Sequence, residues 1–408
     1  MTATPEHPVL VVGAGPIGMS AALALRAAGL PATVLEAGAA DRERPGSRAV
    51  FVHRESLLHL ERVSQGLGWE VARHALTWQT KRTFWGGREV FAKTYRPVPA
   101  GVLPPSVSLP QARTEELLLA ACKAAGVTLV WDAEVTCVES APDGRVRLAT
   151  ADGREWTAAY VIAADGARSA VRAAVDLPLE GSRSANSFVI VDVDEDPDDP
   201  LPPERVFHYH HPAVGGRNVL MVPFAGGWRV DLTCRASDDP ERFQTRDGVR
   251  RWLTQVLPEA YGDRIRWVST YRFLQVLARD FADPTRRVML VGEAAHLFAP
   301  FGARGMNSGI PDALAAVDAA VTALRAGTAA DGALAVEDFA RTRYDAAVYN
   351  RAAANAALRH MLSGDPRLRL RRRAAATLAL AGRRAGAWLD SAPYGPKAAQ
   401  RNRPGSTY

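Results

Sequence analysis

A glycine-rich turn near the start of the chain has the residue types and spacing that hold phosphate groups. The sequence Gly13-Ala-Gly15-Pro-Ile-Gly18 follows the apolar run Val9–Val12 and opens a helix-like segment rich in Ala and Leu. Gly13 allows a tight turn, Gly15 lets a pyrophosphate approach the backbone, and Gly18 lets a helix pack closely on a strand. The unpaired N–H groups and the positive end of that helix attract phosphate. We therefore expect a dinucleotide site at this turn.

An acidic residue at the end of the next strand strengthens that expectation. Ala32–Leu35 is predicted to be a second buried strand, and Glu36 follows it directly. The order strand, helix, strand implies a right-handed crossover and parallel pairing. A carboxylate at the end of the second strand can accept hydrogen bonds from ribose hydroxyls. This motif alone does not separate FAD from NAD.

Three later segments carry further turns of the same kind. The apolar strand Val161–Ala164 runs into Asp165-Gly166, and the apolar strand Val288–Val291 runs into Gly292-Glu293. The third segment, Pro300–Gly309, is a glycine-rich approach to a helix. Each one places small or acidic residues where a strand ends or a helix begins, which is where ligands bind in α/β proteins.

Taken in this order, the four motifs resemble those of the flavoprotein monooxygenases of the para-hydroxybenzoate hydroxylase type. The resemblance is strongest to the branch that contains the hydroxyphenylpropionate and other phenolic-ring hydroxylases, and it extends from about residue 8 to about residue 350. It implies non-covalently bound FAD, with NAD(P)H as a transient reductant and O2 as co-substrate. The implied activity is oxygenation of a small aromatic or polyketide-like molecule through a flavin hydroperoxide.

The same resemblance implies which residues contact the cofactor. A helix beginning at about Gly305–Asn307 would also aim N–H groups at the negative charge of reduced flavin. The chain departs from the family pattern at Glu293, where Asp is usual, and in the helix after Asp312. The expected FAD-binding residues are Gly13, Gly15, Pro16, Gly18, Glu36, Arg48, Gln111, Asp165, Gly166, Gly292, Glu293, Pro300, Gly302, Gly305, Met306 and Asn307.

The substrate side has weaker signals, and no general base is nominated. The run His208–His211 is not expected to bind a metal, because neighbouring side chains in a strand point to opposite faces. We expect no metal site, and a structural role for His296 beside the Gly292 turn. The resemblance places the β-rich segment over the flavin ring, which makes five residues candidates for the substrate pocket: His53, Tyr209, His211, Met221 and Tyr271.

The predicted fold is α/β, with a Rossmann-like FAD-binding domain built on a parallel sheet. A β-rich substrate domain interrupts that domain, and helices follow at the C-terminus. Residues 180–205 are rich in Asp, Pro and Ser, which is typical of a surface segment or linker. The expected boundaries are 1–75, 108–178 and 283–340 for the FAD-binding domain, 76–107 and 179–282 for the substrate domain, and 341–408 for the helices.

The charge and composition of the chain limit the kinds of binding partner that we expect. The 408 residues carry a net charge of +6, and a late cluster of arginines accounts for much of the excess. That cluster lies in an Ala/Leu-rich helical stretch without aromatic stacking residues, so we interpret it as a solvated helix face rather than a nucleic-acid site. No membrane span is predicted. The cluster comprises Arg367, Arg369, Arg371, Arg372, Arg373, Arg383 and Arg384.

The three cysteines, Cys122, Cys137 and Cys234, form no CxxC and no metal spacing. We expect each to be buried and inert, and the protein to be cytoplasmic. A homodimer is left open.

Rival functions remain at this point. A biosynthetic cyclase or isomerase could retain FAD without using its redox chemistry, which the departures at Glu293 and after Asp312 keep open. A flavin dehydrogenase with its own nicotinamide domain would need a second GxGxxG or a redox CxxC, and the sequence has neither. A flavin halogenase would need a tryptophan-rich motif, which is absent around Trp228.

Overall fold

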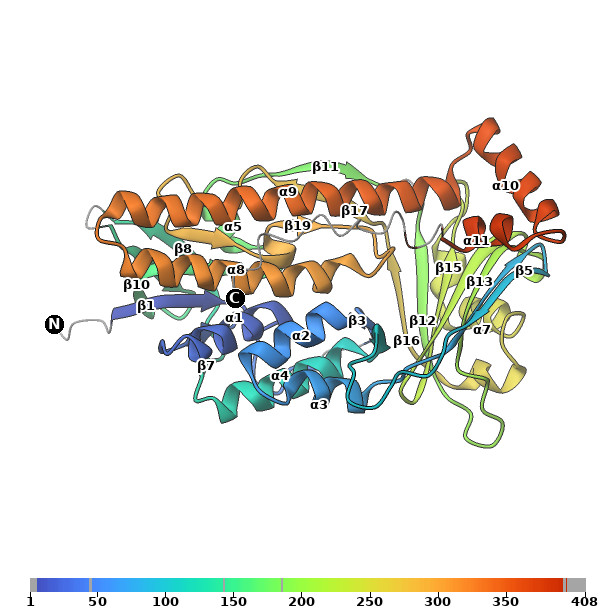
Figure 1. Ribbon diagram of the computed structural model, residues 1–408, viewed down its shortest axis with the longest axis horizontal. Coiled ribbons are helices and arrows are strands. Elements are labelled where there is room, and N and C mark those ends of the chain that lie inside the picture. Colours follow the sequence, from blue (N-terminus) through green and yellow to red (C-terminus); the bar gives the residue numbers. More distant parts are fainter. Residues whose placement is uncertain (1–5, 44–45, 142–143, 185, 392–393, 395–408) are drawn as a thin grey trace.

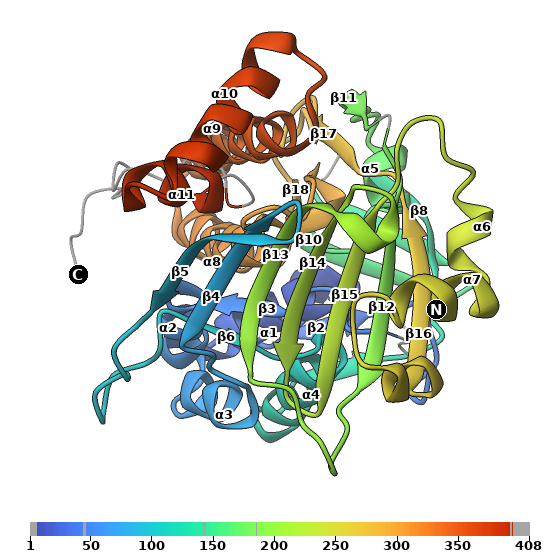
Figure 2. The same ribbon diagram turned by 90° about the vertical axis from the view of Figure 1, so that its right-hand side faces the viewer.

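Two seven-stranded sheets organise the part of the chain that the computed structural model describes, which is residues 6–43, 46–141, 144–184, 186–391 and 394. One sheet lies within an α/β unit that holds the start of the chain. The other stands beside that unit, as the two views show (Figure 1, Figure 2). The fold class predicted from the sequence is confirmed, and the domain boundaries stay a prediction.

The sheet of the α/β unit has the strand order β7-β2-β1-β10-β9-β8, and β18 also pairs with β10. Strands β7, β2, β1, β10 and β18 run parallel, whereas β9 and β8 are antiparallel. The central parallel strands β2 and β18 and the C-terminal halves of β1 and β10 are apolar and buried, as expected where helices or a second layer cover both faces, whereas the edge strand β7 is partly exposed. The strands are β1 Glu6–Val12, β2 Thr33–Leu35, β7 Thr128–Val130, β8 Val135–Ser140, β9 Val146–Thr150, β10 Glu155–Ala163 and β18 Val288–Leu290.

Helix α1 is the centre of the α/β core. It contacts α4 and α8 as well as β1 and β2, and its side chains from Met19 to Leu25 are buried. Alanines at positions 21, 22 and 24 keep α1 narrow, which allows this close packing. The helices of this unit are α1 Pro16–Ala27, α2 Arg54–Val63, α3 Leu67–His74, α4 Gln111–Ala124, α5 Ala170–Ala174 and α8 Arg304–Arg325.

The second sheet has the strand order β16-β12-β15-β14-β13-β4-β5 (Figure 2). The expectation that residues 180–205 form a surface segment is wrong, because β12 lies inside this sheet between β15 and β16. Its apolar residues are buried, so the Ser-containing segment before it and the Asp- and Pro-rich segment after it had masked a core strand. The strands are β4 Thr80–Trp85, β5 Arg88–Thr94, β12 Phe188–Asp194, β13 Glu204–His211, β14 Arg217–Phe224, β15 Gly227–Thr233 and β16 Ile265–Tyr271.

The two faces of this sheet differ in composition. We call the face that carries Val189, Val191 and Val193 the outer face; it packs in an apolar cluster with α7 (Arg246–Leu253), preceded by the short α6 (Glu241–Gln244). The opposite, inner face carries Phe188, Ile190 and Asp192 and the residues opposite them on β15 and β16. Contacts from this inner face reach the α/β unit, as described below.

Short strands and long helices complete the fold. Helix α9 has 34 residues, about 51 Å of helix, and runs from the α/β unit to the second sheet (Figure 1). Among the described residues no helix is long and apolar enough to cross a membrane. The remaining elements are β3 Phe51–His53, β6 Ser106–Ser108, β11 Leu179–Arg183, β17 Leu274–Ala278, β19 His296–Leu297, α9 Ala329–Leu362, α10 Pro366–Leu378 and α11 Arg383–Ser391.

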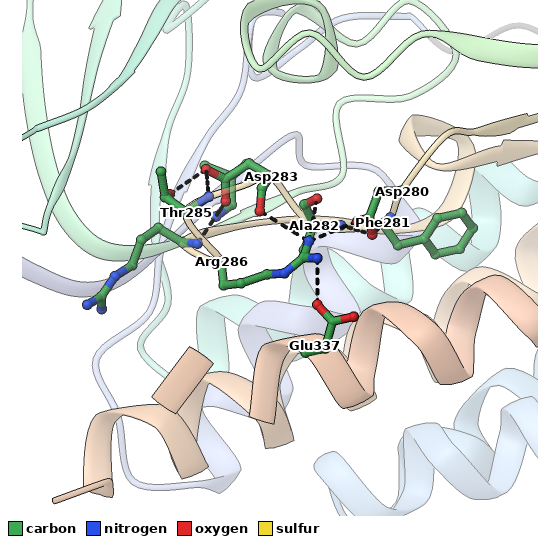
Figure 3. Close-up of polar contacts among 9 residues, drawn as sticks. Asp280, Phe281, Ala282, Asp283, Thr285, Arg286 and Glu337 are labelled. Carbon is green, nitrogen blue, oxygen red and sulfur yellow. Dashed lines mark hydrogen bonds and ion pairs between the residues drawn. The ribbon is translucent and has the colours of Figure 1, made fainter. Parts of the chain in front are cut away.

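A polar turn fixes the entry of β18 (Figure 3). The buried carboxylate of Asp283 accepts hydrogen bonds from the backbone N–H groups of Arg287 and Val288, each at 2.8 Å. The Arg286 guanidinium donates to Asp280 and forms an ion pair with Glu337 of α9. These contacts tie β18 to the long helix, so the turn at the far end of β18 has a fixed position.

Candidate functional site

The glycine turn after β1 has the geometry that the sequence predicts. Gly13 adopts a φ of +99°, and a Cβ there would lie 2.5 Å from the carbonyl oxygen of Ala164. A Cβ on Gly18 would overlap the carbonyl oxygen of Gly13. Gly15 differs, because no atom lies within 4 Å of the position its Cβ would take. Two glycines are therefore required by packing, and the middle one leaves bare backbone beside open space.

Glu36 lies against this turn. Its carboxylate accepts hydrogen bonds from the N–H of Ala14 at 2.6 Å and of Gly38 at 3.0 Å. Arg42 forms an ion pair with it at 3.1 Å. The residue expected to meet a ribose thus also holds the glycine turn in shape.

The Asp165-Gly166 turn after β10 lies next to Gly13. A Cβ on Gly13 would be 2.9 Å from the Cα of Asp165. The Asp165 Oδ2 atom accepts from the N–H of Val171 at 3.1 Å, whereas Oδ1 is buried without a hydrogen-bond partner among the described residues. Burial raises the pKa of this carboxyl, although hydrogen bonds partly offset the effect. Gly166, with a φ of +81°, has open space where its Cβ would be.

The third turn, Gly292-Glu293, packs against the start of α1 and against α8. A Cβ on Gly292 would lie 3.0 Å from Ile17 of α1, and one on Gly309 of α8 would lie 3.2 Å from the Cα of Gly292. Solvent reaches the Glu293 side chain, yet the surrounding protein desolvates it and raises its pKa, an effect opposed by His296 and Arg48. Glu293 and Arg48 are therefore within electrostatic range of each other.

An arginine absent from the predictions connects two of these turns. Arg172 of α5 donates to the carbonyl oxygen of Ala294 at 3.0 Å and to that of Ala167 at 3.2 Å. It also interacts electrostatically with Asp165. We call the surface formed by residues 13–18, 165–166, 292–293 and 302–307 the glycine cradle.

The start of α8 forms the last side of the glycine cradle. The helix begins at Arg304, after Ala303 in a left-handed conformation with a φ of +52°. Gly305 has no atom within 4 Å of its would-be Cβ, so the first turn of the helix has bare backbone at this point. The positive end of the helix dipole is thus available to a negatively charged ligand group.

Asn307 lies in this first turn, but its side chain is used within the protein. Its Oδ1 atom accepts from the N–H of His53 at 2.8 Å and from the Ser56 hydroxyl at 2.7 Å. Its Nδ2 group donates to the carbonyl oxygens of Phe51 and Ala303. The amide therefore fixes β3 and α2 to α8, and only the backbone of Asn307 remains for a cofactor.

A buried ionic network holds the Gly292 turn from behind. The Asp312 carboxylate on α8 contacts the His296 Nε2 atom at 2.6 Å and accepts from Arg343 of α9 at 2.7 Å. Both Asp312 and His296 are only 1% exposed. Although burial opposes ionisation, Arg343 and His296 hold the pKa of Asp312 below its usual range. His296 thus has the structural position that the sequence suggested, with its ring stacked on Phe298.

The inner face of the second sheet grips the loop that carries Arg48. Asp192 accepts hydrogen bonds from the N–H and the hydroxyl of Ser47, the latter at 2.7 Å. Arg229 donates to the carbonyl oxygen of Arg48. From the other side, Gln111 accepts from the N–H of Ala49 at 3.3 Å. Arg48 itself is exposed, with a φ of +46°.

Two of the five pocket candidates lie on this inner side. His53 precedes α2, and burial together with Arg304 lowers its pKa to about 4. Tyr271 is 38% exposed and lies opposite Phe188 in the β12–β16 pair. The Phe188 ring contacts Phe301, so the sheet here touches the segment Pro300–Gly302.

Two of the other three candidates, Met221 and His211, lie on the outer side of the sheet. Met221 packs with Trp228 and Val230 on the outer face, because it is one residue out of phase with the inner-facing positions of β14. His211 shares the side of His208, 4.6 Å between ring centroids, because the strand is irregular at His210, which has a φ of +52°. Neither side chain therefore lies on the inner face.

Tyr209 does face inward, but it does not line a pocket. It is fully buried, and its hydroxyl donates to the carbonyl oxygen of Leu389 in α11 at 2.9 Å. The C-terminal helix, whose position the sequence did not reveal, covers this part of the inner face.

Comparison with known proteins decides the family. The model of the family described as "FAD binding domain" matches residues 6–352. The chain belongs to the FAD-binding domain family. The predicted cofactor, FAD, is thereby confirmed.

Relatives within the FAD-binding domain family are hydroxylases. The chain is 32% identical over 323 residues to 6-methylpretetramide 4-monooxygenase of Streptomyces rimosus, covering 75% of this chain and 54% of that protein. It is 26% identical over 309 residues to 3-(3-hydroxy-phenyl)propionate/3-hydroxycinnamic acid hydroxylase of Shigella sonnei, with the same coverage. The resemblance to the hydroxyphenylpropionate hydroxylase branch is confirmed. The chain spans about half the length of these relatives.

Solved structures agree on the fold. The p-nitrophenol 4-monooxygenase PnpA from Pseudomonas putida DLL-E4 superposes with a TM-score of 0.77 at 23% identity, covering 96% of this chain and 99% of that one. The Diels-Alderase PyrE3 of pyrroindomycin biosynthesis superposes with a TM-score of 0.69 at 20% identity, covering 96% of this chain and 80% of that one. At these identities the likeness is one of fold alone.

The residues of the glycine cradle fit the cofactor of the FAD-binding domain family. Gly15, Gly166 and Gly305 each have open space where a side chain would be, so backbone can be approached at three points. The accessible carboxylate of Glu293 leaves an acceptor for a cofactor hydroxyl. The geometry thus has room and polar groups for an extended dinucleotide.

Sequence reasoning missed four residues that support this site: Arg172, Asp192, Arg229 and Arg343. Asp192 had a usable signal, since it is a charged residue inside the otherwise apolar strand β12. The arginines had none, because each meets its partner from another element.

Proposed function

We propose that the chain is an NAD(P)H-dependent FAD monooxygenase that hydroxylates a small aromatic or polyketide-like ring. The observation that carries the proposal is the meeting of the Gly13, Asp165 and Gly292 turns with the start of α8 in one glycine cradle. When bound, FAD supplies the redox chemistry, taking electrons from the nicotinamide and passing one oxygen atom of O2 to the substrate. The relatives with 6-methylpretetramide and hydroxyphenylpropionate in their names support the substrate class.

The cradle residues divide the cofactor between them. Gly13, Gly15, Pro16 and Gly18 with Glu36 hold the adenosine half and the pyrophosphate, because bare N–H groups at the start of α1 attract phosphate. Asp165, Gly166, Gly292 and Glu293 hold the chain between the two halves. Gln111 holds the loop that carries Arg48, and the Arg48 side chain lies beside the pyrophosphate.

The flavin end lies at the start of α8. The residues there are Pro300, Gly302, Gly305, Met306 and Asn307, of which Asn307 contributes backbone only. The positive end of the helix, worth about 0.3–1 kcal/mol to a nearby anion in exposed settings and up to about 2 kcal/mol when partly buried, stabilises negative charge on the reduced ring. This favours transfer of electrons to the cofactor.

The inner face of the second sheet supplies the substrate side. Ile190 and Val222 are apolar and buried, and Arg229 pairs with Asp231 at 2.8 Å among them. A mostly apolar wall with a few fixed polar groups suits a flat ring that carries hydroxyls. His53, whose pKa of about 4 keeps it neutral at pH 7, and Tyr271 orient the ring by hydrogen bonding.

Product analysis under labelled oxygen tests this proposal. Purified protein loaded with FAD is given phenolic and polyketide candidates, NADH or NADPH, and 18O2. We expect substrate-stimulated consumption of reductant and a product heavier by one 18O atom. Reductant consumption without a labelled product from any candidate would refute the hydroxylase function, since uncoupled oxidation yields only peroxide.

A second candidate is a cyclase or isomerase that retains FAD without redox turnover. The presence of a Diels-Alderase among proteins of this fold, and Glu293 where the family usually has Asp, favour keeping it. Turnover of a substrate under argon, with no reductant, would select this function. Strict dependence on both O2 and reductant would exclude it.

A further inference from the structure

A cavity of about 380 Å³ lies at the end of the second sheet, where β14 and β15 meet the C-terminus of α9 and the start of α10. None of its lining residues belongs to the glycine cradle or to the five pocket candidates. Five of them are arginines, and we call it the arginine cavity: Arg217, Arg235, Arg369, Arg372 and Arg373.

The positive charge of the arginine cavity exceeds its negative charge. Arg217 is neutralised, because it donates twice to Asp238, at 2.6 and 2.8 Å. Among the described residues, no ion pair is formed by Arg235, Arg369, Arg372 or Arg373. Asp238 also interacts electrostatically with Arg235, so in the described structure three guanidinium groups, those of Arg369, Arg372 and Arg373, line one small volume without a carboxylate of their own.

Arg372 is the most unusual of these groups. The sequence suggested a solvated helix face, but this side chain is only 4% exposed. Its terminal nitrogens donate to the carbonyl oxygens of His360, Met361 and Ser363 at the end of α9. Its Nε atom is buried without a hydrogen-bond partner in the described structure. A buried cation with only helix-end carbonyls beside it is incompletely compensated.

The size and walls of the arginine cavity indicate what would compensate it. Trp85, Met361 and Leu362 add apolar surface beside the arginines. The volume lies within the range of about 300–1,000 Å³ that is typical of small-molecule sites, so a bare inorganic ion would leave most of it empty. Guanidinium forks match the oxygen atoms of carboxylates and phosphates.

We propose that the arginine cavity binds an organic anion, with a carboxylate or phosphate head against Arg369, Arg372 and Arg373 and an apolar or aromatic body against Trp85. This site is separate from the cofactor and goes beyond the monooxygenase function. The ligand adds the negative charge that the chain itself does not provide there.

Binding of phenyl phosphate and of benzoate to the FAD-loaded protein tests the proposal by calorimetry and by the fluorescence of Trp85. Inorganic phosphate and neutral benzyl alcohol serve as comparison probes. We expect at least one of the two organic anions to bind, more tightly than inorganic phosphate, and benzyl alcohol not to bind. Equal binding of benzyl alcohol, or tighter binding of inorganic phosphate, would overturn the proposal.

Matched double variants locate the site. Arg369→Ala/Arg373→Ala removes two exposed guanidinium groups from the cavity, and Arg367→Ala/Arg384→Ala removes two exposed ones from outside its lining. Each lost charge-assisted contact should weaken binding about tenfold, so the first variant should lose binding and the second should keep it. Equal affinity in both variants would overturn the proposal, and unchanged FAD content in both shows that the flavin site is intact.

Arg372→Met separates ligand binding from a purely structural role. If Arg372 only closes the end of α9, the variant loses stability but still binds the organic anion as the wild type does, which contradicts the proposal. We expect the folded variant to lose binding. Should it fail to fold, the double variants above still decide.

Discussion

The glycine cradle and the arginine cavity both suit negatively charged groups, but they provide positive charge by different means. In the cradle, bare backbone at Gly15, Gly166 and Gly305 and the starts of α1 and α8 provide it. In the cavity, guanidinium groups provide it. A backbone site is damaged by adding atoms, whereas a side-chain site is damaged by removing charge. The variants below test that difference, from the largest expected effect to the smallest.

Adding a side chain to the cradle should have the largest effect, and its kind should depend on the glycine. Gly18→Val would place atoms on the carbonyl of Gly13, so we expect no folded protein, a cost well above ~3 kcal/mol. Gly15→Ala meets nothing within 4 Å and should fold normally, but its methyl group occupies the space of the pyrophosphate. Thermal unfolding and FAD titration measure both variants. Full FAD affinity in Gly15→Ala would contradict the cradle.

Removing the buried carboxylate of Asp312 behind the cradle should lower the free energy of unfolding by less than Gly18→Val does, but by far more than removing a surface carboxylate. Asp312→Asn leaves the buried His296 and the partly buried Arg343 without their partner, and we expect a loss of about 3–5 kcal/mol in the free energy of unfolding. Asp338→Asn, which breaks the exposed pair with Arg341, is the control and should cost under about 1 kcal/mol. Equal losses in urea unfolding would show that the buried network does not support the Gly292 turn.

Near the arginine cavity, a single buried histidine, His360, makes the folded protein less stable in acid, whereas in the cradle several groups have opposing effects. Burial lowers the pKa of His360 to about 4 from its ordinary value of 6.5. The unfolded chain therefore takes up a proton between these values while the folded chain does not, so stability falls as the pH drops from 6.5 to 4. His360→Gln should flatten this slope in urea unfolding curves recorded across that range. An unchanged slope would contradict a neutral, buried His360.

In the cradle, a histidine and two carboxyls titrate in the acidic range, and their effects on the free energy of unfolding oppose one another. His53 behaves as His360 does, with a pKa of about 4. Burial raises the pKa of Asp165 and Glu293, so these carboxyls favour the folded state at low pH and lose that contribution as the pH rises from their unfolded pKa values through their higher folded ones. His53→Gln should therefore make the stability fall less steeply between pH 6.5 and 4, which the same unfolding curves would reveal.

Changing the cradle carboxylate should have the smallest effect. Glu293→Asp shortens a side chain that solvent already reaches, and FAD affinity should change by no more than about fivefold. Glu293→Ala removes the acceptor and should weaken FAD by more than that. Titration of apoprotein with FAD measures both, and equal affinity in the alanine variant and the wild type would remove Glu293 from the site.

The cradle could be predicted from the sequence because its parts are local. The φ of +99° at Gly13 and the close approach of Gly18 demand glycine, so spacing along the chain encodes the geometry. The strand β12 could not be predicted as easily, because the polar segment before it and the Asp- and Pro-rich segment after it hid its buried residues.

Side-chain positions on the second sheet were predicted least well. The irregularity at His210 turns His211 away from the inner face, and a pattern of alternation does not reveal where such a break occurs. Tyr209 and Arg372 depend on where the C-terminal helices pack, which is a long-range property. Of the cysteines, Cys122 and Cys234 are buried as expected, and Cys137 is only half-buried.

The central claim is that four separated segments form one site for an extended flavin dinucleotide, and flavin release from the purified protein tests it most directly. Protein reconstituted with FAD, washed and denatured should release one FAD per chain, and Gly15→Ala treated in the same way should release much less. Wild-type protein that folds yet stays colourless and retains no flavin would contradict the account.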